Sequence, residues 1–190
     1  MFFSKNPIQK GSSREKFFFL CAFFCFVLCT ALDQLTKHLV VSHIDKFTRI
    51  HVIPGFFDLT YITNPGAAFG IFAGKGYMLL AVSVLVFVLL ILFFRAITEG
   101  WSERILAVSL ILSGIAGNSI DRVFRGEVVD FLRVYYKNWE WPSFNVADSC
   151  ICVGVFIYIL SVLVHPEHRK NHETSHESSS SSPNSEESAQ

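Results

Sequence analysis

The sequence predicts an all-α polytopic membrane protein with four transmembrane helices. Of its 190 residues, 51% are hydrophobic and 20 are phenylalanine, and the mean hydropathy of +0.42 is high for a soluble domain. Four apolar segments each approach the roughly 20 residues that a helix needs to cross a bilayer. The formal net charge is +0, which gives no electrostatic basis for nucleic-acid binding.

A basic head, residues 1–16, precedes the first apolar segment. Its basic residues are Lys5, Lys10, Arg14 and Lys16. Basic residues before an apolar run also describe a cleaved signal sequence, but no small-x-small motif ends this run. We therefore expect a retained helix at about 17–33.

Segment 44–76 is polar enough to lie outside the membrane. Aromatic and β-branched residues follow a Pro-Gly turn at 56–63, which is typical of a short strand. Asn64-Pro65-Gly66 is a turn signal. The small apolar residues 67–72 are too few to span a bilayer and suit a surface helix or a re-entrant turn.

Three further spans complete the predicted bundle. They are expected at about 77–95, 104–121 and 147–164. No charged residue occurs from Tyr77 to Phe94, and Gly114 and Gly117 would allow close helix contact in the third span.

Four spans place both termini on the same side of the membrane. The 16 Lys and Arg residues divide equally between the two sides, so their number does not set the orientation. The density of basic residues in the head favours cytoplasmic termini. Residues 165–190 would then be a cytoplasmic tail, Ser-rich and too poor in apolar residues to fold.

Carboxylates at membrane depth are candidates for function, because ionisable groups are rare there. On the predicted strand 127–136, Asp130 shares a face with Val128, Leu132 and Val134. Burial would raise the pKa of Asp130, which suits a carboxyl group that is protonated part of the time. An edge strand with one inward charge is the structural alternative.

The last span is predicted to begin with a helix cap. Asn145 would be the cap, with Asp148 at the third helical position near the positive end of the helix. This environment favours the ionised form of Asp148 and so contrasts with that of Asp130. Such contrasts mark general acid and base pairs, although a helix cap alone would also explain Asn145 and Asp148.

Further polar residues lie near the ends of the first and third spans. Asp33 and Lys37 are four residues apart and can pair, either as a mark of the helix end or in a functional role. Asn118, Asp121 and Arg122 share a face, and Asp121 beside Arg122 is interpreted as a helix-end charge pair. The tryptophans and tyrosines of 135–144 are interpreted as an interfacial belt.

No serine-hydrolase, zinc-protease, P-loop or dinucleotide motif occurs in the sequence. The histidines lack metal-ligand spacing. We therefore expect no metal and no cofactor.

Five motifs in order make the chain resemble the signal peptidase II family, the lipoprotein signal peptidases, over about residues 17–164. They are Asp33-Gln34-x-Thr36-Lys37, Asn64-x-Gly66-Ala67-Ala68-Phe69, Gly117-Asn118-x-x-Asp121-Arg122, Val128-Val129-Asp130-Phe131 and Phe144-Asn145-x-Ala147-Asp148-Ser149. Pro65 stands where many members of the family carry Thr.

The resemblance implies a membrane aspartyl endopeptidase that cuts prolipoproteins before a diacylglyceryl-modified cysteine. Its catalytic residues would be Asp130 and Asp148. The substrate would be held by Asn64, Asn118, Arg122 and Asn145. Structural support would come from Asp33, Lys37, Gly66 and Asp121. Segment 44–72 would form a small extracytoplasmic β-cradle and an interfacial helix.

Lipid-modified prolipoproteins and membrane lipid are the expected partners, and a monomer is the default expectation. The enzyme would lie in the bacterial cytoplasmic (inner) membrane, with its site at the extracytoplasmic face. A small proton-coupled transporter and a non-catalytic scaffold are the alternatives. Against a transporter, the acids cluster at one interface and no internal repeat is visible. A scaffold would not need both Asp130 and Asp148.

Overall fold

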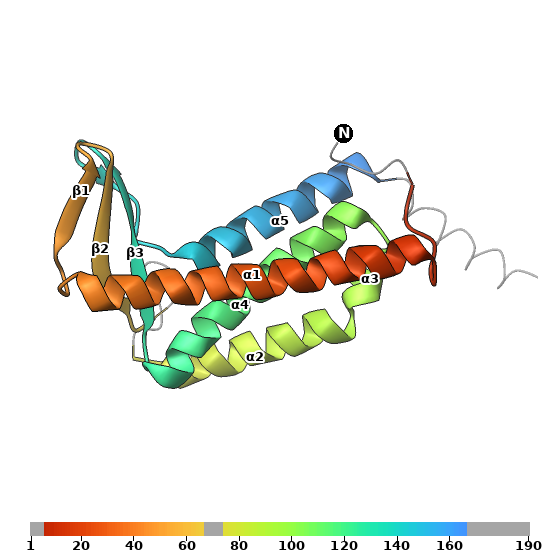
Figure 1. Ribbon diagram of the computed structural model, residues 1–190, viewed down its shortest axis with the longest axis horizontal. Coiled ribbons are helices and arrows are strands. Elements are labelled where there is room, and N and C mark those ends of the chain that lie inside the picture. The colour runs from red at the N-terminus through yellow and green to blue at the C-terminus, as the bar shows by residue number, and fades with distance from the viewer. Residues whose placement is uncertain (1–5, 67–73, 167–190) are drawn as a thin grey trace, which may run out of the picture.

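The computed structural model describes residues 6–66 and 74–166. An elongated helical body carries a β-sheet at one end, and the sheet stands upright against the helices (Figure 1). The helices are α1 (Ser13–His43), α2 (Gly76–Leu92), α3 (Phe94–Thr98), α4 (Ser102–Phe124) and α5 (Val146–Val164). The strands are β1 (Arg49–Ile53), β2 (Phe57–Asn64), β3 (Val128–Tyr136) and β4 (Trp139–Glu140).

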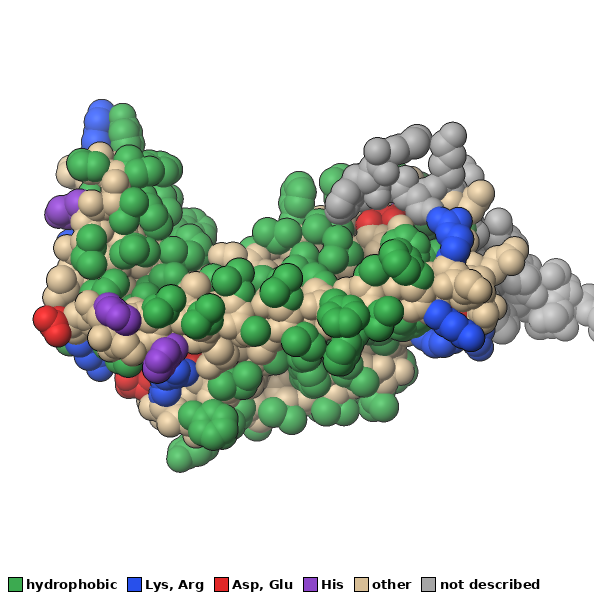
Figure 2. Space-filling model, in the orientation of Figure 1, with side chains coloured by type: hydrophobic (Ala, Val, Ile, Leu, Met, Phe, Trp, Pro, Cys, Tyr) green, Lys and Arg blue, Asp and Glu red, His purple; other side chains and the backbone are tan. Residues whose placement is uncertain are grey.

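Three helices, α1, α4 and α5, are long and apolar enough to cross a membrane, and α2 is a shorter apolar helix of 17 residues. On the face shown in Figure 2, hydrophobic side chains are spread along the helical body, while charged side chains gather at its two ends. Water-soluble proteins rarely expose so large an apolar surface. The helical body is therefore built to face lipid.

Helix α1 is longer than predicted at both ends. It begins at Ser13, inside the segment expected to be a head, where Ser12 caps the helix by accepting a hydrogen bond from Glu15 N. It continues to His43 and does not end near residue 33. Asp33 and Lys37 form the predicted pair. Of the two alternatives for this pair, a mark of the helix end is wrong, because both side chains are buried against α4 and do not face solvent.

The four strands form one antiparallel sheet in the order β1-β2-β3-β4. The strands predicted at 56–63 and 127–136 are confirmed as β2 and β3, and they pair with each other, with Ile62 opposite Asp130. Strands β1 and β4 were not predicted. The surface helix or turn expected at 67–72 and most of the tail lie outside the described residues.

A charge network around the buried pair of Asp58 and Arg133 joins the strands. Arg133 of β3 donates to Asp58 of β2 at 2.6 Å and to both carboxylate oxygens of Glu140 of β4. His51 of β1 and the hydroxyl of Tyr135 also contact Asp58. Burial acts to raise the pKa of Asp58, but these hydrogen bonds outweigh it and lower the pKa. The network therefore holds β3 in place beside β2.

Helix α4 lies at the centre of the helical body, in contact with α1, α2 and α5. Glycine makes the contact with α5 close: a Cβ atom at Gly154 would lie 2.7 Å from Ala107 O, and one at Gly114 would overlap the backbone of Ala147. A Cβ at Gly117 would lie 2.5 Å from the Asp33 carboxylate. The predicted role of Gly114 and Gly117 in close packing is confirmed.

Replacing Gly154 by alanine should destabilise the bundle by about 1–3 kcal/mol, because the added methyl group must push α4 and α5 apart. Thermal unfolding in detergent measures the change. Val153→Ala is the matched control, since Val153 is adjacent and half exposed on the outside of α5. Equal melting temperatures for Gly154→Ala and the control would contradict the close contact.

Candidate active site

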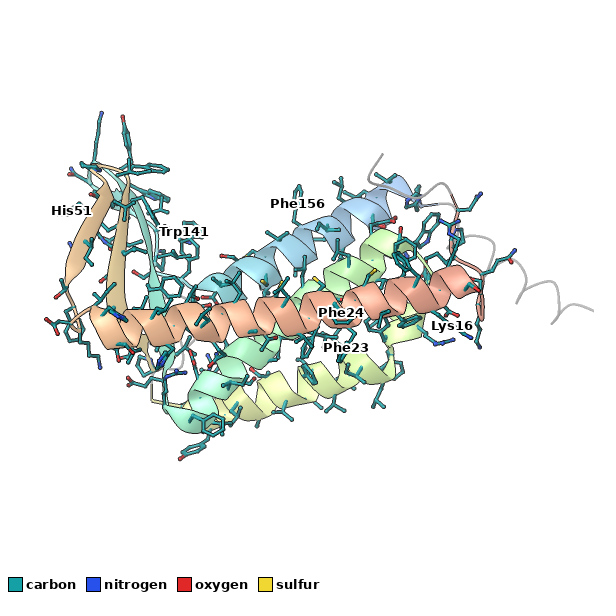
Figure 3. The ribbon with its side chains drawn as sticks, viewed as in Figure 1. Lys16, Phe23, Phe24, His51, Trp141 and Phe156 are labelled. Carbon is teal, nitrogen blue, oxygen red and sulfur yellow. The ribbon has the colours of Figure 1, made fainter. Side chains whose placement is uncertain are left out.

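A polar recess lies where the sheet meets the helical body. Its volume is about 480 Å³, and it opens between β3, the C-terminal part of α4 and the first turns of α5. Trp141 lies near this junction (Figure 3). The recess is lined by Asn64, Gly66, Asn118, Arg122, Val128, Asp130, Trp141, Pro142, Ser143, Phe144, Asp148, Ser149, Ile151, Cys152 and Val153. Both predicted catalytic aspartates are therefore brought together.

Asp130 reaches the recess from β3 and is 4% exposed. Its carboxylate accepts hydrogen bonds from Asn145 Nδ2 at 2.8 Å and from Asn64 Nδ2 at 3.2 Å. Burial and then the negative charge of Asp148 raise the pKa of Asp130 to about 7, against the opposing effect of the two asparagines and Lys37. The raised pKa predicted from the apolar strand face is confirmed.

Asp148 reaches the recess from the first turn of α5. Asn145 caps the helix by accepting from Asp148 N at 3.0 Å, and Asp148 Oδ2 accepts in return from Asn145 N at 3.2 Å. The predicted cap is confirmed. The predicted contrast between the two environments is wrong: both carboxylates are withdrawn from solvent in one recess, and both accept hydrogen bonds from asparagine.

Two asparagine amides link the carboxylates. Asn118 Nδ2 donates to Asp148 Oδ1 at 2.8 Å, while Asn145 Nδ2 donates to Asp130. The amides also meet each other, because Asn145 Nδ2 lies 3.2 Å from Asn118 Oδ1. The predicted substrate-binding residues Asn118 and Asn145 thus hold the pair of acids.

Behind the asparagines lies a buried cluster of Asp33, Lys37 and Asp121, each at most 1% exposed. Lys37 Nζ contacts a carboxylate oxygen of Asp33 and one of Asp121, both at 2.9 Å. The interpretation of Asp121 as the partner of Arg122 is wrong, because Asp121 pairs with Lys37 and Arg125. The side chain of Asp121 points into the α1–α4 contact, where Lys37 is the buried cation.

The cluster also holds the two elements that carry the acids. Asp33 Oδ1 accepts a hydrogen bond from Ala147 N at the start of α5, at 2.8 Å. Asp121 Oδ2 accepts one from Val129 N of β3, at 3.1 Å. Ala147 precedes Asp148 and Val129 precedes Asp130, so the cluster holds the backbone directly beside each candidate catalytic residue.

Arg122 lines the recess and binds the chain that forms its edge. Its guanidinium donates to Gly66 O at 3.1 Å and to Asn118 O at 3.3 Å. Gly66 N in turn donates to Asn64 Oδ1 at 2.9 Å. The turn at 64–66 is thereby held so that Asn64 reaches Asp130.

The wall formed by residues 141–144 was not predicted as part of the site. The sequence suggested only a membrane belt for these aromatics, whereas Trp141 and Phe144 line the recess. Their position just before the Asn145 cap was the available signal. A second groove of about 480 Å³, between α1, α2, α3 and α4, is lined by apolar side chains apart from Ser109 and Arg95 and offers no acid–base pair.

The model of the family described as Signal peptidase (SPase) II matches residues 25–164. The chain is 48% identical to a lipoprotein signal peptidase of Syntrophotalea carbinolica, over 70% of this chain and 85% of the relative. It is 44% identical to one of Geobacter sulfurreducens, over 73% and 88% of the two chains. A solved bacterial membrane enzyme superimposes with a TM-score of 0.72 and 31% identity, covering 78% of this chain and 90% of that chain.

The raised pKa of Asp130 predicts a pH-dependent gain in stability for Asp130→Asn. An aspartate with a pKa near 4 when unfolded and about 7 when folded makes the folded state less stable as the pH rises between these values. The asparagine side chain would not ionise, so at pH 8 the free energy of unfolding of the variant should exceed that of wild type by a few kcal/mol at most, and its melting temperature should be higher. At pH 4 the two proteins should have nearly equal melting temperatures. Melting curves at both pH values measure this.

The exposed carboxylate of Asp45 supplies the control for this measurement. Asp45→Asn makes the same chemical change at the surface, so its melting curves at the two pH values are the reference for those of Asp130→Asn. If the stability difference between Asp130→Asn and wild type does not grow with pH, then ionising Asp130 does not destabilise the folded protein, and the raised pKa is contradicted.

Proposed function

Because this chain belongs to the signal peptidase II family, it removes the signal peptides of prolipoproteins, and we propose that Asp130 and Asp148 carry out the hydrolysis. The observation that carries this proposal is the meeting of the two carboxylates in one recess, from β3 and α5, with asparagine amides bonded to both. Two acids placed in this way suit general acid–base chemistry.

In the proposed reaction, one carboxylate accepts a proton from the attacking water. The other, protonated, donates a hydrogen bond to the oxygen of the scissile carbonyl group. When the tetrahedral intermediate collapses, the C–N bond breaks and the leaving amine takes the proton that the first carboxylate had accepted from the water, which returns both acids to their starting states. The two acids share one proton, so the titration that governs the rate belongs to the pair.

The recess also suits the substrate that we propose, a peptide cut before a diacylglyceryl-modified cysteine. Asn64 and Arg122 supply N–H groups at its edge for an extended peptide, which needs partners for its backbone at membrane depth. Ile151, Cys152 and Val153 of α5 supply an apolar wall. Val153 is half exposed on the surface of the bundle, so this wall is continuous with the lipid and suits the apolar part of the substrate.

We further propose four membrane spans, with α2 as the second. Its 17 residues measure about 26 Å at 1.5 Å per residue, close to the roughly 30 Å of the hydrocarbon core. Residues 1–16 and 165–190 would lie in the cytoplasm. The sheet lies at the opposite end of the body from the start of α1 (Figure 1), and the recess is lined by β3 and the adjoining ends of α4 and α5. This arrangement supports an extracytoplasmic site in the bacterial inner membrane, with the sheet as its cradle. We propose that the protein acts as a monomer.

Asp130→Asn and Asp148→Asn should each lower cleavage of a lipid-modified prolipoprotein by roughly a hundredfold or more, because each removes one acid–base group and nearly keeps its shape. Precursor shortening on a gel, with enzyme in membranes, measures the rate. Asp45→Asn, which alters an exposed carboxylate, should cleave as wild type does. A wild-type rate in either variant would exclude that residue from the catalytic pair.

The orientation predicts opposite results for reporters fused at the two ends of the body. Alkaline phosphatase, which is active only outside the cytoplasm, should be active when inserted after Lys137, between β3 and β4. It should be inactive when fused after Pro166. The reverse pattern would invert the orientation, and activity at both positions would show that α5, the one helix between them, does not cross the membrane.

A further inference from the structure

Lys37 makes one contact that charge neutralisation does not explain. Its ammonium group has three N–H groups, and three acceptors surround it: Asp33 Oδ2 and Asp121 Oδ2, both at 2.9 Å, and Asn118 Oδ1 at 3.0 Å. The first two contacts balance charge within the buried cluster. The third is made to a neutral amide that is bonded to Asp148.

The amide of Asn118 has two orientations of nearly equal shape, and its neighbours decide between them. Its oxygen faces Lys37 and Asn145 Nδ2, and its nitrogen donates to Asp148 at 2.8 Å. An ammonium group can only donate. The flipped amide would place its NH₂ against Lys37 and its oxygen against the Asp148 carboxylate, so Lys37 excludes that orientation.

The second asparagine is fixed by a donor in the same way. Asn145 Oδ1 accepts from the backbone N–H of Asp148 at 3.0 Å, which leaves Asn145 Nδ2 to donate to Asp130 at 2.8 Å and towards Asn118. Lys37 at one end and the first turn of α5 at the other thus set the direction of both amides. Each acid receives an N–H group as a result.

We propose that Lys37 is a positioning residue of the catalytic pair, which fixes the Asn118 amide so that Nδ2 donates to Asp148. This inference rests on the proposed function, because it takes Asp130 and Asp148 as the acids. It differs from structural support: the side chain acts through Asn118 on the chemistry. Hydrogen bonding to a carboxylate favours its ionised form, so losing this contact should move the acidic limb of the pH–rate profile to higher pH.

Several charged groups face the pair and must be balanced in the test. Lys37 and Asp33 lie on α1, and Asp121 and Arg122 on α4. Lys37→Met alone would leave Asp33 without its cation. The double variant Lys37→Met/Asp33→Asn removes one positive and one negative charge, keeps Asp121 paired with Arg125, and leaves an amide oxygen at position 33 for Ala147 N.

The double variant should fold and cleave, with kcat lowered roughly ten- to hundredfold and the acidic limb raised by about one pH unit, while KM changes little. Thr30→Val is the matched control, because Thr30 donates to Ser113 O between α1 and α4 and does not contact Lys37, Asn118 or Asp148. Its kcat and pH profile should equal those of wild type.

A second arm measures coupling. Asn118→Ala alone should lower kcat, because it removes the amide between Lys37 and Asp148. Adding Lys37→Met/Asp33→Asn to Asn118→Ala should then lower kcat little further. If Lys37 and Asn118 acted independently, the two reductions in kcat would multiply. Wild-type kcat and pH profile in the double variant would make Lys37 a neutralising charge only. A double variant that fails to fold would make Lys37 a structural residue, which also overturns the positioning role. Full cleavage by Asp130→Asn or Asp148→Asn would instead overturn the proposed pair, whatever the Lys37 variants do.

Discussion

The buried ammonium group of Lys37 stabilises the junction of α1, α4, α5 and β3 at which the site forms. Lys37 joins α1 to α4 through Asp121, and the carboxylates it neutralises hold Ala147 of α5 and Val129 of β3. Removing one member of such a buried ion pair leaves a charge without its partner, which destabilises proteins by about 3–5 kcal/mol. Four elements therefore take their mutual positions from one charge cluster, and the recess forms where they meet.

The sheet supplies the other constraint. Asp130 enters the recess because β3 pairs with β2 on one side and with the backbone of Phe144 on the other. The buried pair of Asp58 and Arg133 fixes that pairing farther along the strand. A strand with partners on both sides places an acidic side chain more firmly than a loop could, as acid–base chemistry requires.

Local patterns in the sequence predicted the acids but not their meeting. The apolar face around Asp130 and the cap at Asn145 are encoded within a few residues, and the structure confirms both. The length of α1 was predicted wrongly, because two charged residues, Asp33 and Lys37, suggested that the helix ends there. The sequence does not show that their charges are balanced inside the protein, by each other and by Asp121 of α4. The amide bridge between the acids depends on strand pairing and helix packing across the chain, which no local pattern contains.

Asn145 connects the folding of α5 to the environment of the acids within one side chain. Its oxygen caps the helix and its nitrogen donates to Asp130. Capping alone would accept serine, threonine or aspartate, but none of these supplies an amide N–H to the carboxylate. Helix capping and the hydrogen bond to Asp130 therefore place two separate demands on position 145, and serine, threonine or aspartate there would cap α5 while removing the amide N–H group from the site.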